Sequence, residues 1–339
     1  MWLNDVWYVL FVIIISGYLI MDGFDLGVGI LHPYVAKTDT ERRLMLNSIG
    51  PVWDGNEVWL VLGGGALFAA FPLVYASLFS GFYLAMMLVL LVLILRTVAI
   101  EFRSKRPGAT WRSVWDGVFF ASSTGIALLL GVAFGNIMAG VPLDEQGNIS
   151  ISLIALLNPF ALLVGITTVM MLAMHGSIYV AMKTEGELQT RVRQVTPRLM
   201  GIFVVLNTLV VVGTISNQSV ITNRYLDQIW PVIFPALALA AMIAAWYWTR
   251  QAEEFKAFLA SSAVIALLLW AAAAGLYPNL LISTLNPDYN LTIYNGASAP
   301  NSLMVMLIIA LIGMPFVLLY TTGVYYIFRG KVKLGGESY

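Results

Sequence analysis

Nine long apolar runs are the feature that most constrains the fold of this chain. They fall at about 7–34, 51–74, 77–101, 115–137, 158–181, 197–216, 229–249, 257–282 and 302–328. A run of about 20 apolar residues is long enough to cross the hydrocarbon core of a bilayer as a helix. Backbone polar groups in lipid must be paired within their own segment, which favours helices over open strands. The sequence therefore predicts an all-α polytopic membrane protein with nine transmembrane helices.

The composition supports this prediction and excludes several other classes. The 339 residues are 60% hydrophobic and 11% charged, whereas a soluble domain is about 25% charged. The net charge is zero, which gives no bulk attraction to nucleic acid, and the absence of cysteine excludes disulfides, iron–sulfur clusters and thiolate haem ligands. The first apolar run starts without a basic region or a small-residue cleavage site, so we interpret it as an uncleaved span. We expect residues 1–339 to form one integral membrane domain.

Lysine and arginine positions orient the predicted spans. Cytoplasmic loops carry an excess of these residues, and alternate loops of a nine-span chain share one side. That side holds sixteen of the 18 basic residues, namely Lys37, Arg42, Arg43, Arg103, Lys105, Arg106, Arg112, Lys183, Arg191, Arg193, Arg198, Arg250, Lys256, Arg329, Lys331 and Lys333. The other side has only Arg224, and Arg96 lies within a span. We therefore expect the N-terminus outside and the C-terminus in the cytoplasm.

Two aspartates interrupt the first span, in the stretch IMDGFDLGVG at residues 20–29. With a helical rise of about 1.5 Å per residue counted from Trp7, Asp22 lies roughly 22 Å and Asp25 roughly 27 Å into the membrane. Both therefore fall in the cytoplasmic half of a core about 30 Å thick. Residues three apart share one helix face, so the two carboxylates are expected side by side.

The next two spans bring further charges to the same depth. The stretch PVWDGNEVW at residues 51–59 places Asp54 and Glu57 three residues apart near a helix N-terminus, where the macrodipole favours negative charge. Arg96 lies near the cytoplasmic end of the third span, and Glu101 follows five residues later. An ionisable residue within a span is a functional hypothesis by default. One arginine does not compensate four or five carboxylates, so we expect a proton path or cation site that opens to the cytoplasm.

A structural role for these charges is the alternative at this point. Arg96 would then neutralise one or two carboxylates, Asp54 would cap a helix, and Glu101 would be solvated.

The chain has only two histidines that could serve as haem ligands. His175 is the one membrane histidine, and His32 lies near the end of the first span. We expect His175 to be a hydrogen-bonded or relay residue, and we expect no haem bound solely by this chain.

Several motifs together resemble subunit II of cytochrome bd-type ubiquinol or menaquinol oxidases. They are DGFDLGVGIL at 22–31, the long block that begins ERRLMLNSIGPVWDGNEVW at residue 41, EFRSK at 101–105, GVAFGN at 131–136, LLNPFALL at 156–163 and LLYTTGVYYIFRGKV at 318–332. The resemblance covers the whole chain, with short outer loops.

The resemblance implies a fold, partners and cofactors beyond the residue patterns. The fold is nine helices arranged as two four-helix bundles plus one additional helix. The partner is subunit I, which carries haems of types b and d, or of type b alone, and small single-helix subunits often accompany the pair. The complex oxidises quinol and reduces dioxygen to water in the bacterial or archaeal cytoplasmic (inner) membrane. The chain itself is implied to contain no catalytic or haem-binding residue, no assigned metal ligand, and at most a structural quinone.

The resemblance also assigns roles to the charged residues. It implies a proton pathway through Asp22, Asp54, Glu57 and Glu101, and a cation site or electrostatic partners at Asp25, Arg96, Trp53 and Asn56. Glu101 stands where some members have aspartate, and Glu57 stands where some have glutamine. The terminal Tyr339 is expected to fold back on this cluster.

Two other functional readings remain open from the sequence. A stand-alone proton- or cation-coupled transporter would carry discontinuous helices near the midplane with breaks in corresponding halves, but here the prolines lie mainly at helix ends. A purely structural scaffold for subunit I would retain turnover after Asp22→Asn or Asp54→Asn.

Overall fold

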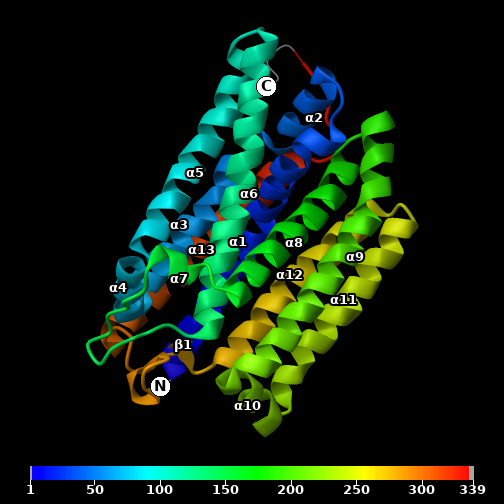
Figure 1. The fold of residues 1–339 in the computed structure, drawn as a ribbon. Helices are drawn as coiled ribbons and strands as arrows, with labels where there is room; N and C mark the ends of the chain where they lie inside the picture. The colour runs from blue at the N-terminus through cyan, green and yellow to red at the C-terminus, as the bar shows by residue number, and fades with distance from the viewer. Residues whose placement is uncertain (1, 336–339) are drawn as a thin grey trace.

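The computed structural model describes residues 2–335 as a bundle of long helices with one small two-stranded sheet (Figure 1). The long helices are α1 (Trp2–Val35), α3 (Trp53–Ala70), α5 (Tyr83–Phe102), α6 (Ala109–Ala139), α8 (Pro159–Lys183), α9 (Gly186–Asn217), α11 (Ile233–Arg250), α12 (Glu254–Leu276) and α13 (Pro300–Ile327). The shorter elements are α2 (Asp39–Ile49), α4 (Pro72–Gly81), η1 (Arg103–Lys105), α7 (Leu153–Leu156), α10 (Ser219–Asp227), η2 (Trp230–Val232), β1 (Asn279–Leu281), η3 (Pro287–Tyr289) and β2 (Leu291–Thr292). The all-helical prediction is confirmed.

Eight helices within residues 2–335 are long and apolar enough to cross a membrane, judged by length and composition. They are α1, α5 with η1, α6, α8, α9, η2 with α11, α12 and α13. Helix α3 has 18 residues and carries Asp54 and Glu57, and it does not belong to this set. The structure therefore supports a polytopic membrane protein.

The predicted boundary between the second and third spans is misplaced. The chain breaks at Phe71, where α3 ends and Pro72 begins α4, rather than at residues 75–76. Proline lacks a backbone N–H and has a fixed φ, so it starts a helix more readily than it continues one. The predicted span 257–282 likewise ends early, because α12 stops at Leu276 and the chain enters β1.

Helix α1 occupies the centre of the molecule and contacts α3, α6, α8 and α12. Its crossing with α8 is very close at Gly27 and Gly176, where a Cβ on Gly27 would lie 2.0 Å from the Leu172 carbonyl oxygen. Small residues allow membrane helices to approach in this way. The crossing fixes the height of α1 relative to α8.

The two ends of the molecule have different characters. At one end, called here the α2 end, α2, η1, the turn between α8 and α9, and segment 329–335 meet (Figure 1). The opposite end, called the β1 end, carries β1, β2 and α10, together with the start of α1. The antiparallel pairing of β1 with β2 and two isolated bridges connect the loops there.

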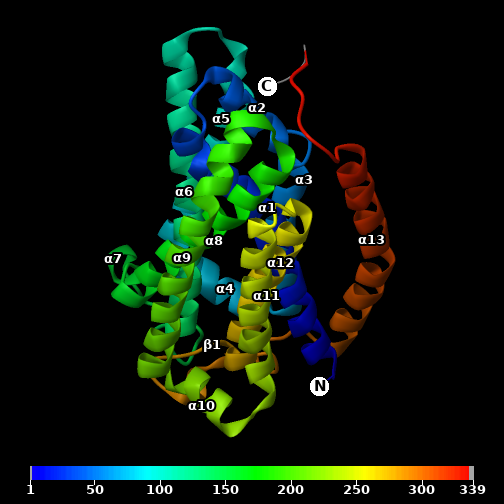
Figure 2. The same ribbon diagram turned by 90° about the vertical axis from the view of Figure 1, so that its right-hand side faces the viewer.

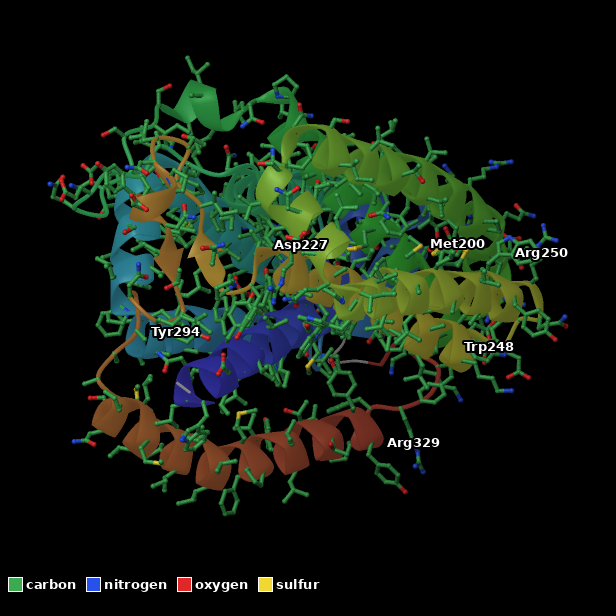
Figure 3. All side chains as sticks on the ribbon, turned by 90° about the horizontal axis from the view of Figure 1, so that it is seen from below. Met200, Asp227, Trp248, Arg250, Tyr294 and Arg329 are labelled. Carbon is green, nitrogen blue, oxygen red and sulfur yellow. The ribbon has the colours of Figure 1, made fainter. Side chains whose placement is uncertain are left out.

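Helix α13 stands apart from the rest of the molecule. In Figure 2 it bows away from α1 and α3 over most of its length, and Figure 3 shows it along one edge with Arg329 at its end. Of its residues, Leu303 and Leu307 near the β1 end are buried. Most of α13 therefore presents apolar side chains outward.

Candidate functional site: buried carboxylates beside Arg96

The carboxylates of α1 lie inside the protein near the α2 end. Asp22 and Asp25 are both fully buried, as is Arg96 of α5. The Arg96 Nη2 atom donates to Asp22 Oδ1 at 2.5 Å, and this is a salt bridge between two side chains that solvent does not reach. The predicted cation site groups Arg96 with Asp25, whereas in the structure the hydrogen-bonded partner of Arg96 is Asp22.

Asp25 has a different partner, which comes from α3. The Asn56 Nδ2 atom donates to Asp25 Oδ2 at 2.8 Å and to the Met21 carbonyl oxygen at 3.2 Å. The Asn56 Oδ1 atom accepts a hydrogen bond from the Tyr325 hydroxyl of α13 at 2.7 Å. Asn56 is itself buried, so it links α1, α3 and α13 at one point.

The pairing of this carboxylate site, defined as Asp22, Asp25, Asn56 and Arg96, is incomplete. Asp22 Oδ2, Asp25 Oδ1, Arg96 Nε and Arg96 Nη1 are enclosed, and they have no hydrogen-bond partner among the described residues 2–335. Enclosed polar atoms without partners are costly. Two carboxylates with one guanidinium favour a bound proton, cation or water at this site.

The other predicted residues lie around this site at different depths. Trp53 is buried, Glu57 is half-buried, and Asp54 is exposed in the first turn of α3. Glu57 is close enough to Arg96 and Asp22 for an electrostatic interaction, and Asp54 is its neighbour. Glu101 is half-buried near the end of α5. The structure thus joins Asp22, Asp25, Asn56 and Arg96 directly, whereas Asp54 faces outward from α3.

His175 is hydrogen-bonded through both ring nitrogens, as predicted. Nδ1 lies 2.8 Å from Ser261 Oγ, and Nε2 lies 3.0 Å from the Ile20 carbonyl oxygen. Its ring stacks on Phe258 with a centroid distance of 4.9 Å. These contacts occupy the positions that a metal ion would need, so His175 does not fit an axial haem ligand.

A second charged cluster at the α2 end was missed by the sequence analysis. The carboxylate of Asp116 binds Arg103 through both oxygens, at 2.5 Å from Nε and 3.2 Å from Nη2, and accepts from Arg42 at 2.8 Å. Asp39 accepts from Arg103 and from Arg112, both at 2.8 Å. We call Asp39, Asp116, Arg42, Arg103 and Arg112 the arginine network. The available signal was Asp116, a charge at the second residue of the predicted span 115–137.

His32 lies at the edge of the arginine network. It is fully buried, and its Nε2 atom is 3.6 Å from Asp116 Oδ1. Neither of its ring nitrogens has a hydrogen-bond partner within residues 2–335. The network therefore encloses His32 between the end of α1 and α6.

The acids of α2 are held in the ionised form. Burial raises the pKa of Glu41, but hydrogen bonds from the Lys37 and Thr38 backbone N–H groups and from Arg191 outweigh it, so the pKa lies below its ordinary value of 4.5. Burial also raises the pKa of Asp39, but the hydrogen bond and the charge of Arg103 have the larger combined effect. The pKa of Asp39 therefore lies below its ordinary value. Both acids are ionised at neutral pH.

The C-terminal segment contacts the α2 end. Lys331 Nζ donates to the carbonyl oxygens of Ala181 and Thr184 at 3.1 and 2.9 Å, and the Val332 backbone N–H donates to Lys183 O at 2.8 Å. The predicted contact of Tyr339 lies outside the described residues.

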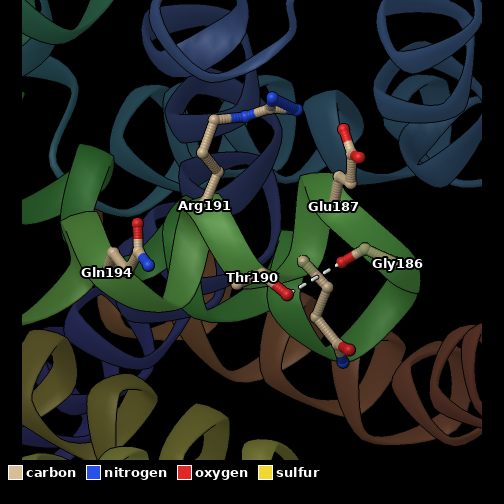
Figure 4. Close-up of a pocket in the computed structure, with 6 residues that line it drawn as sticks. Gly186, Glu187, Thr190, Arg191 and Gln194 are labelled. Atoms are coloured by element: carbon tan, nitrogen blue, oxygen red, sulfur yellow. Dashed lines mark hydrogen bonds between the residues drawn. The ribbon is translucent and has the colours of Figure 1, made fainter.

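Residues 2–335 show few features outside the carboxylate site that could bind a metal ion or another ligand. No group of three or more histidine, cysteine, aspartate or glutamate side chains in this part of the chain could hold a metal ion. An open pocket at the start of α9 is lined by Gly186, Glu187, Gln189, Thr190, Arg191 and Gln194 (Figure 4). Its residues are not those of the carboxylate site.

Comparisons with known proteins agree on one family. Residues 3–328 match the family described as cytochrome bd terminal oxidase subunit II. The probable cytochrome oxidase subunit 2 of Haemophilus influenzae is 37% identical, with 94% of this chain and 92% of that protein covered. The cytochrome bd-I ubiquinol oxidase subunit 2 of Escherichia coli K12 is 35% identical, with 97% and 95% covered. The cytochrome bd ubiquinol oxidase subunit 2 of Bacillus subtilis is also 35% identical, with 98% and 97% covered.

The fold is shared with a solved oxidase. A chain in the structure of the bd oxidase from Geobacillus thermodenitrificans superimposes with a TM-score of 0.81 and 17% identity, with 97% of this chain and 99% of that chain covered. These findings do not favour a stand-alone transporter. The chain belongs to the family of cytochrome bd terminal oxidase subunit II and is one subunit of an oxidoreductase complex.

Proposed function

We propose that this subunit delivers protons to the oxygen chemistry of its complex through the carboxylate site, and that it stabilises the haem-bearing subunit I. The complex oxidises quinol and reduces dioxygen to water, and this subunit is not catalytic alone. The observation that carries the proposal is the incomplete pairing of Asp22 and Asp25 inside the protein. A purely structural ion pair is expected to satisfy its buried atoms.

The proton route proposed here runs from the α2 end inward. Glu57 interacts electrostatically with the outward-facing Asp54 and with both members of the Asp22–Arg96 pair. We propose that a proton that enters beside α3 passes from Asp54 through Glu57 to Asp22. Glu101 near the end of α5 is a second entry group. Carboxylates that are grouped around one arginine can pass a proton from one to the next, which suits transfer along this route. A monovalent cation bound by the unpaired oxygens of Asp22 and Asp25 is the alternative occupant of the site. Asn56 would then orient Asp25 through its N–H group, and Trp53 lies in the adjoining first turn of α3.

The proposed topology has nine spans, with α3 and α4 as the second crossing. The N-terminus is outside, the C-terminus is in the cytoplasm, and the membrane is the bacterial or archaeal cytoplasmic membrane. The arrangement is two four-helix bundles with α13 as the additional helix. Support comes from the α2 end, where the basic residues that contact Asp39, Asp116, Glu41 and Glu254 gather, as the positive-inside rule expects.

The face proposed for subunit I is formed by α3, α5 and α13. An exposed carboxylate such as Asp54 is costly in lipid, so protein is expected to cover α3. The same face carries exposed apolar side chains, including Val58, Val61, Phe68, Leu88, Leu91, Val305, Ile309 and Phe316. Small single-helix subunits would add to this assembly.

The cofactors are assigned to the partner. Membership in a cytochrome family implies haem in the complex, and neither histidine of this chain fits an axial ligand. His175 has both nitrogens engaged, and His32 is enclosed beside Asp116. Haems of types b and d, or b alone, and the quinol and oxygen sites therefore belong to subunit I, and a structural quinone remains an allowed occupant of this subunit.

The test uses the intact complex in membranes. Asp22→Asn and Asp54→Asn should each slow oxygen consumption at least about tenfold, in line with the usual contribution of a proton-transfer group. Haem content is measured alongside to normalise for assembly. Asp227→Asn, at the exposed end of α10, is the matched control and should leave turnover unchanged. Normal turnover of Asp22→Asn and Asp54→Asn with full haem content would instead show that the subunit is a scaffold.

A further inference from the structure

Helix α13 reaches the carboxylate site with the side chain of Tyr325. Its buried residues Leu303 and Leu307 lie near the β1 end, where the Trp7 indole N–H donates to Leu303 O at 3.0 Å. Toward the α2 end, Tyr325 reaches inward to the Asn56 amide. Between these two positions α13 bows outward (Figure 2). Tyr325 is therefore the connection between α13 and the site on α1.

The ring of Tyr325 is placed by its neighbours. It packs edge-on against Phe24 with a centroid distance of 6.5 Å and an interplanar angle of 88°. Phe24 precedes Asp25 and stacks on Tyr179 at 3.9 Å. The Tyr179 hydroxyl donates to the Ser48 carbonyl oxygen at 2.6 Å. The phenol of Tyr325 thus arrives beside Asp25 on an aromatic support that already exists within the body of the protein.

The hydroxyl of Tyr325 completes the hydrogen bonding of Asn56. An asparagine amide has one oxygen that only accepts and one nitrogen that only donates. With Tyr325 donating to Oδ1, the Nδ2 atom faces Asp25 Oδ2 and the Met21 carbonyl, which are both acceptors. The opposite amide orientation would place two oxygens against each other at Asp25. Asp25 and the Met21 carbonyl therefore set the amide orientation, and Tyr325, whose hydroxyl can donate or accept, donates to the Oδ1 atom that this orientation presents to it. Bonds in such a chain strengthen one another.

We propose that Tyr325 is a positioning residue, which holds the Asn56 amide so that it donates to Asp25 and thereby couples the place of α13 to the carboxylate site. Its effect on turnover rests on the proposed proton function, whereas its effect on the site's geometry does not. The hydroxyl acts through Asn56, so its removal matters only while Asn56 is present.

The experiment is a double-mutant cycle in the intact oxidase complex. Tyr325→Phe keeps the ring and removes the hydroxyl, and turnover should fall about 3- to 10-fold, the size expected for one hydrogen bond. In an Asn56→Ala background the same change should have no further effect, because the partner is gone. The temperature at which half of the complex dissociates or unfolds is measured for the unmodified complex, both single variants and the double variant. These midpoints should show the same coupling between Tyr325 and Asn56. If Asn56→Ala does not assemble, Asn56→Leu provides the second background.

The controls separate this inference from the proposed function. Tyr326→Phe, on the exposed neighbour beneath Arg329, should leave turnover unchanged. The positioning role would be overturned if Tyr325→Phe lowered turnover and thermal stability equally with Asn56 present and with Asn56 replaced. It would also be overturned if Tyr325→Phe lowered neither quantity in either background. If the thermal cycle shows coupling but Asp25→Asn turns over normally, the positioning role stands and the proton function fails. If Asp25→Asn is slow but the cycle shows no coupling, only the positioning role fails.

Discussion

The carboxylate site and the arginine network are both charged and built partly on the first 40 residues, yet the first is buried, the second is partly exposed, and their carboxylates are paired differently. In the arginine network, three arginines face two aspartates, and all four oxygens of Asp39 and Asp116 have partners. In the carboxylate site, one arginine faces two aspartates, and one oxygen of each aspartate has no partner in the part of the chain that the structure describes. Within residues 2–335 the network also leaves Arg42 Nε, Arg103 Nη1 and Arg112 Nε without a partner. The difference therefore lies in the carboxylates: those of the network are fully engaged by arginines that join α2, η1 and α6, whereas those of the carboxylate site each keep an oxygen available to a proton or cation.

Removal of Arg96 should have the largest effect on the stability of the complex among the substitutions in the two charged regions. Arg96→Gln leaves Asp22 buried without its cation, and loss of one partner of a buried pair costs about 3–5 kcal/mol. We expect the yield of assembled complex to fall sharply. In the double variant Asp22→Asn/Arg96→Gln assembly should recover, because neither charge is left alone, but oxygen consumption should stay low. Recovery of both assembly and turnover would show that the pair is structural only.

Loss of Arg103 tests the arginine network. Arg103→Gln removes partners from both Asp39 and Asp116, although Arg42 and Arg112 remain. We expect destabilisation of about 2–3 kcal/mol, seen as a lower midpoint for thermal loss of the complex, with turnover per haem unchanged. Arg112→Gln is the matched control, since its pair with Asp39 is partly exposed and worth about 0–1 kcal/mol. Slow turnover per haem in Arg103→Gln would place the network in the proton route.

Gly27→Ala should disturb both regions together, since Gly27 lies on α1 between Asp25 and His32. Its Cβ would meet the backbone of α8 at 2.0 Å and force the two helices apart. Overpacking of this kind costs about 1–3 kcal/mol, and both thermal stability and turnover should fall. Gly201→Ala is the control, because the space around that residue is open, and it should behave as the unmodified protein does.

Glu41→Gln should have the smallest effect and a defined pH dependence. Glutamine keeps an acceptor for the capping box that Thr38 and Glu41 form at the start of α2. The substitution instead removes the charge that pairs with the partly exposed Arg191, and such a pair is worth about 0–1 kcal/mol. Because the pKa of Glu41 is lowered on folding, its ionised form stabilises the protein above about pH 4.5 and this contribution is lost as pH falls through the folded-state pKa. The difference in thermal stability from the unmodified protein should therefore be present at pH 7 and shrink below pH 4. An equal difference at both pH values would contradict the assignment.

Much of the fold could be predicted from the sequence because a membrane span needs only a long apolar run. The break at Phe71 was misplaced, since the effect of Pro72 on helix register depends on neighbouring contacts. Helix α2 was not predicted from the sequence. The helix is short and lies between two apolar runs, and its one sequence signal is the capping box of Thr38 and Glu41.

The candidate site shows the same division. The sequence by itself determined that Asp22 and Asp25 lie three residues apart in a long apolar run, that Arg96 interrupts another such run, and that the chain belongs with subunit II of bd oxidases. Only the tertiary structure decided that Arg96 pairs with Asp22, that Asn56 serves Asp25, and that Tyr325 reaches the site from α13, about 270 residues away in sequence. Depth follows from the helical rise of one segment, whereas partner choice depends on how α1, α3, α5 and α13 rotate against one another, which side-chain packing sets.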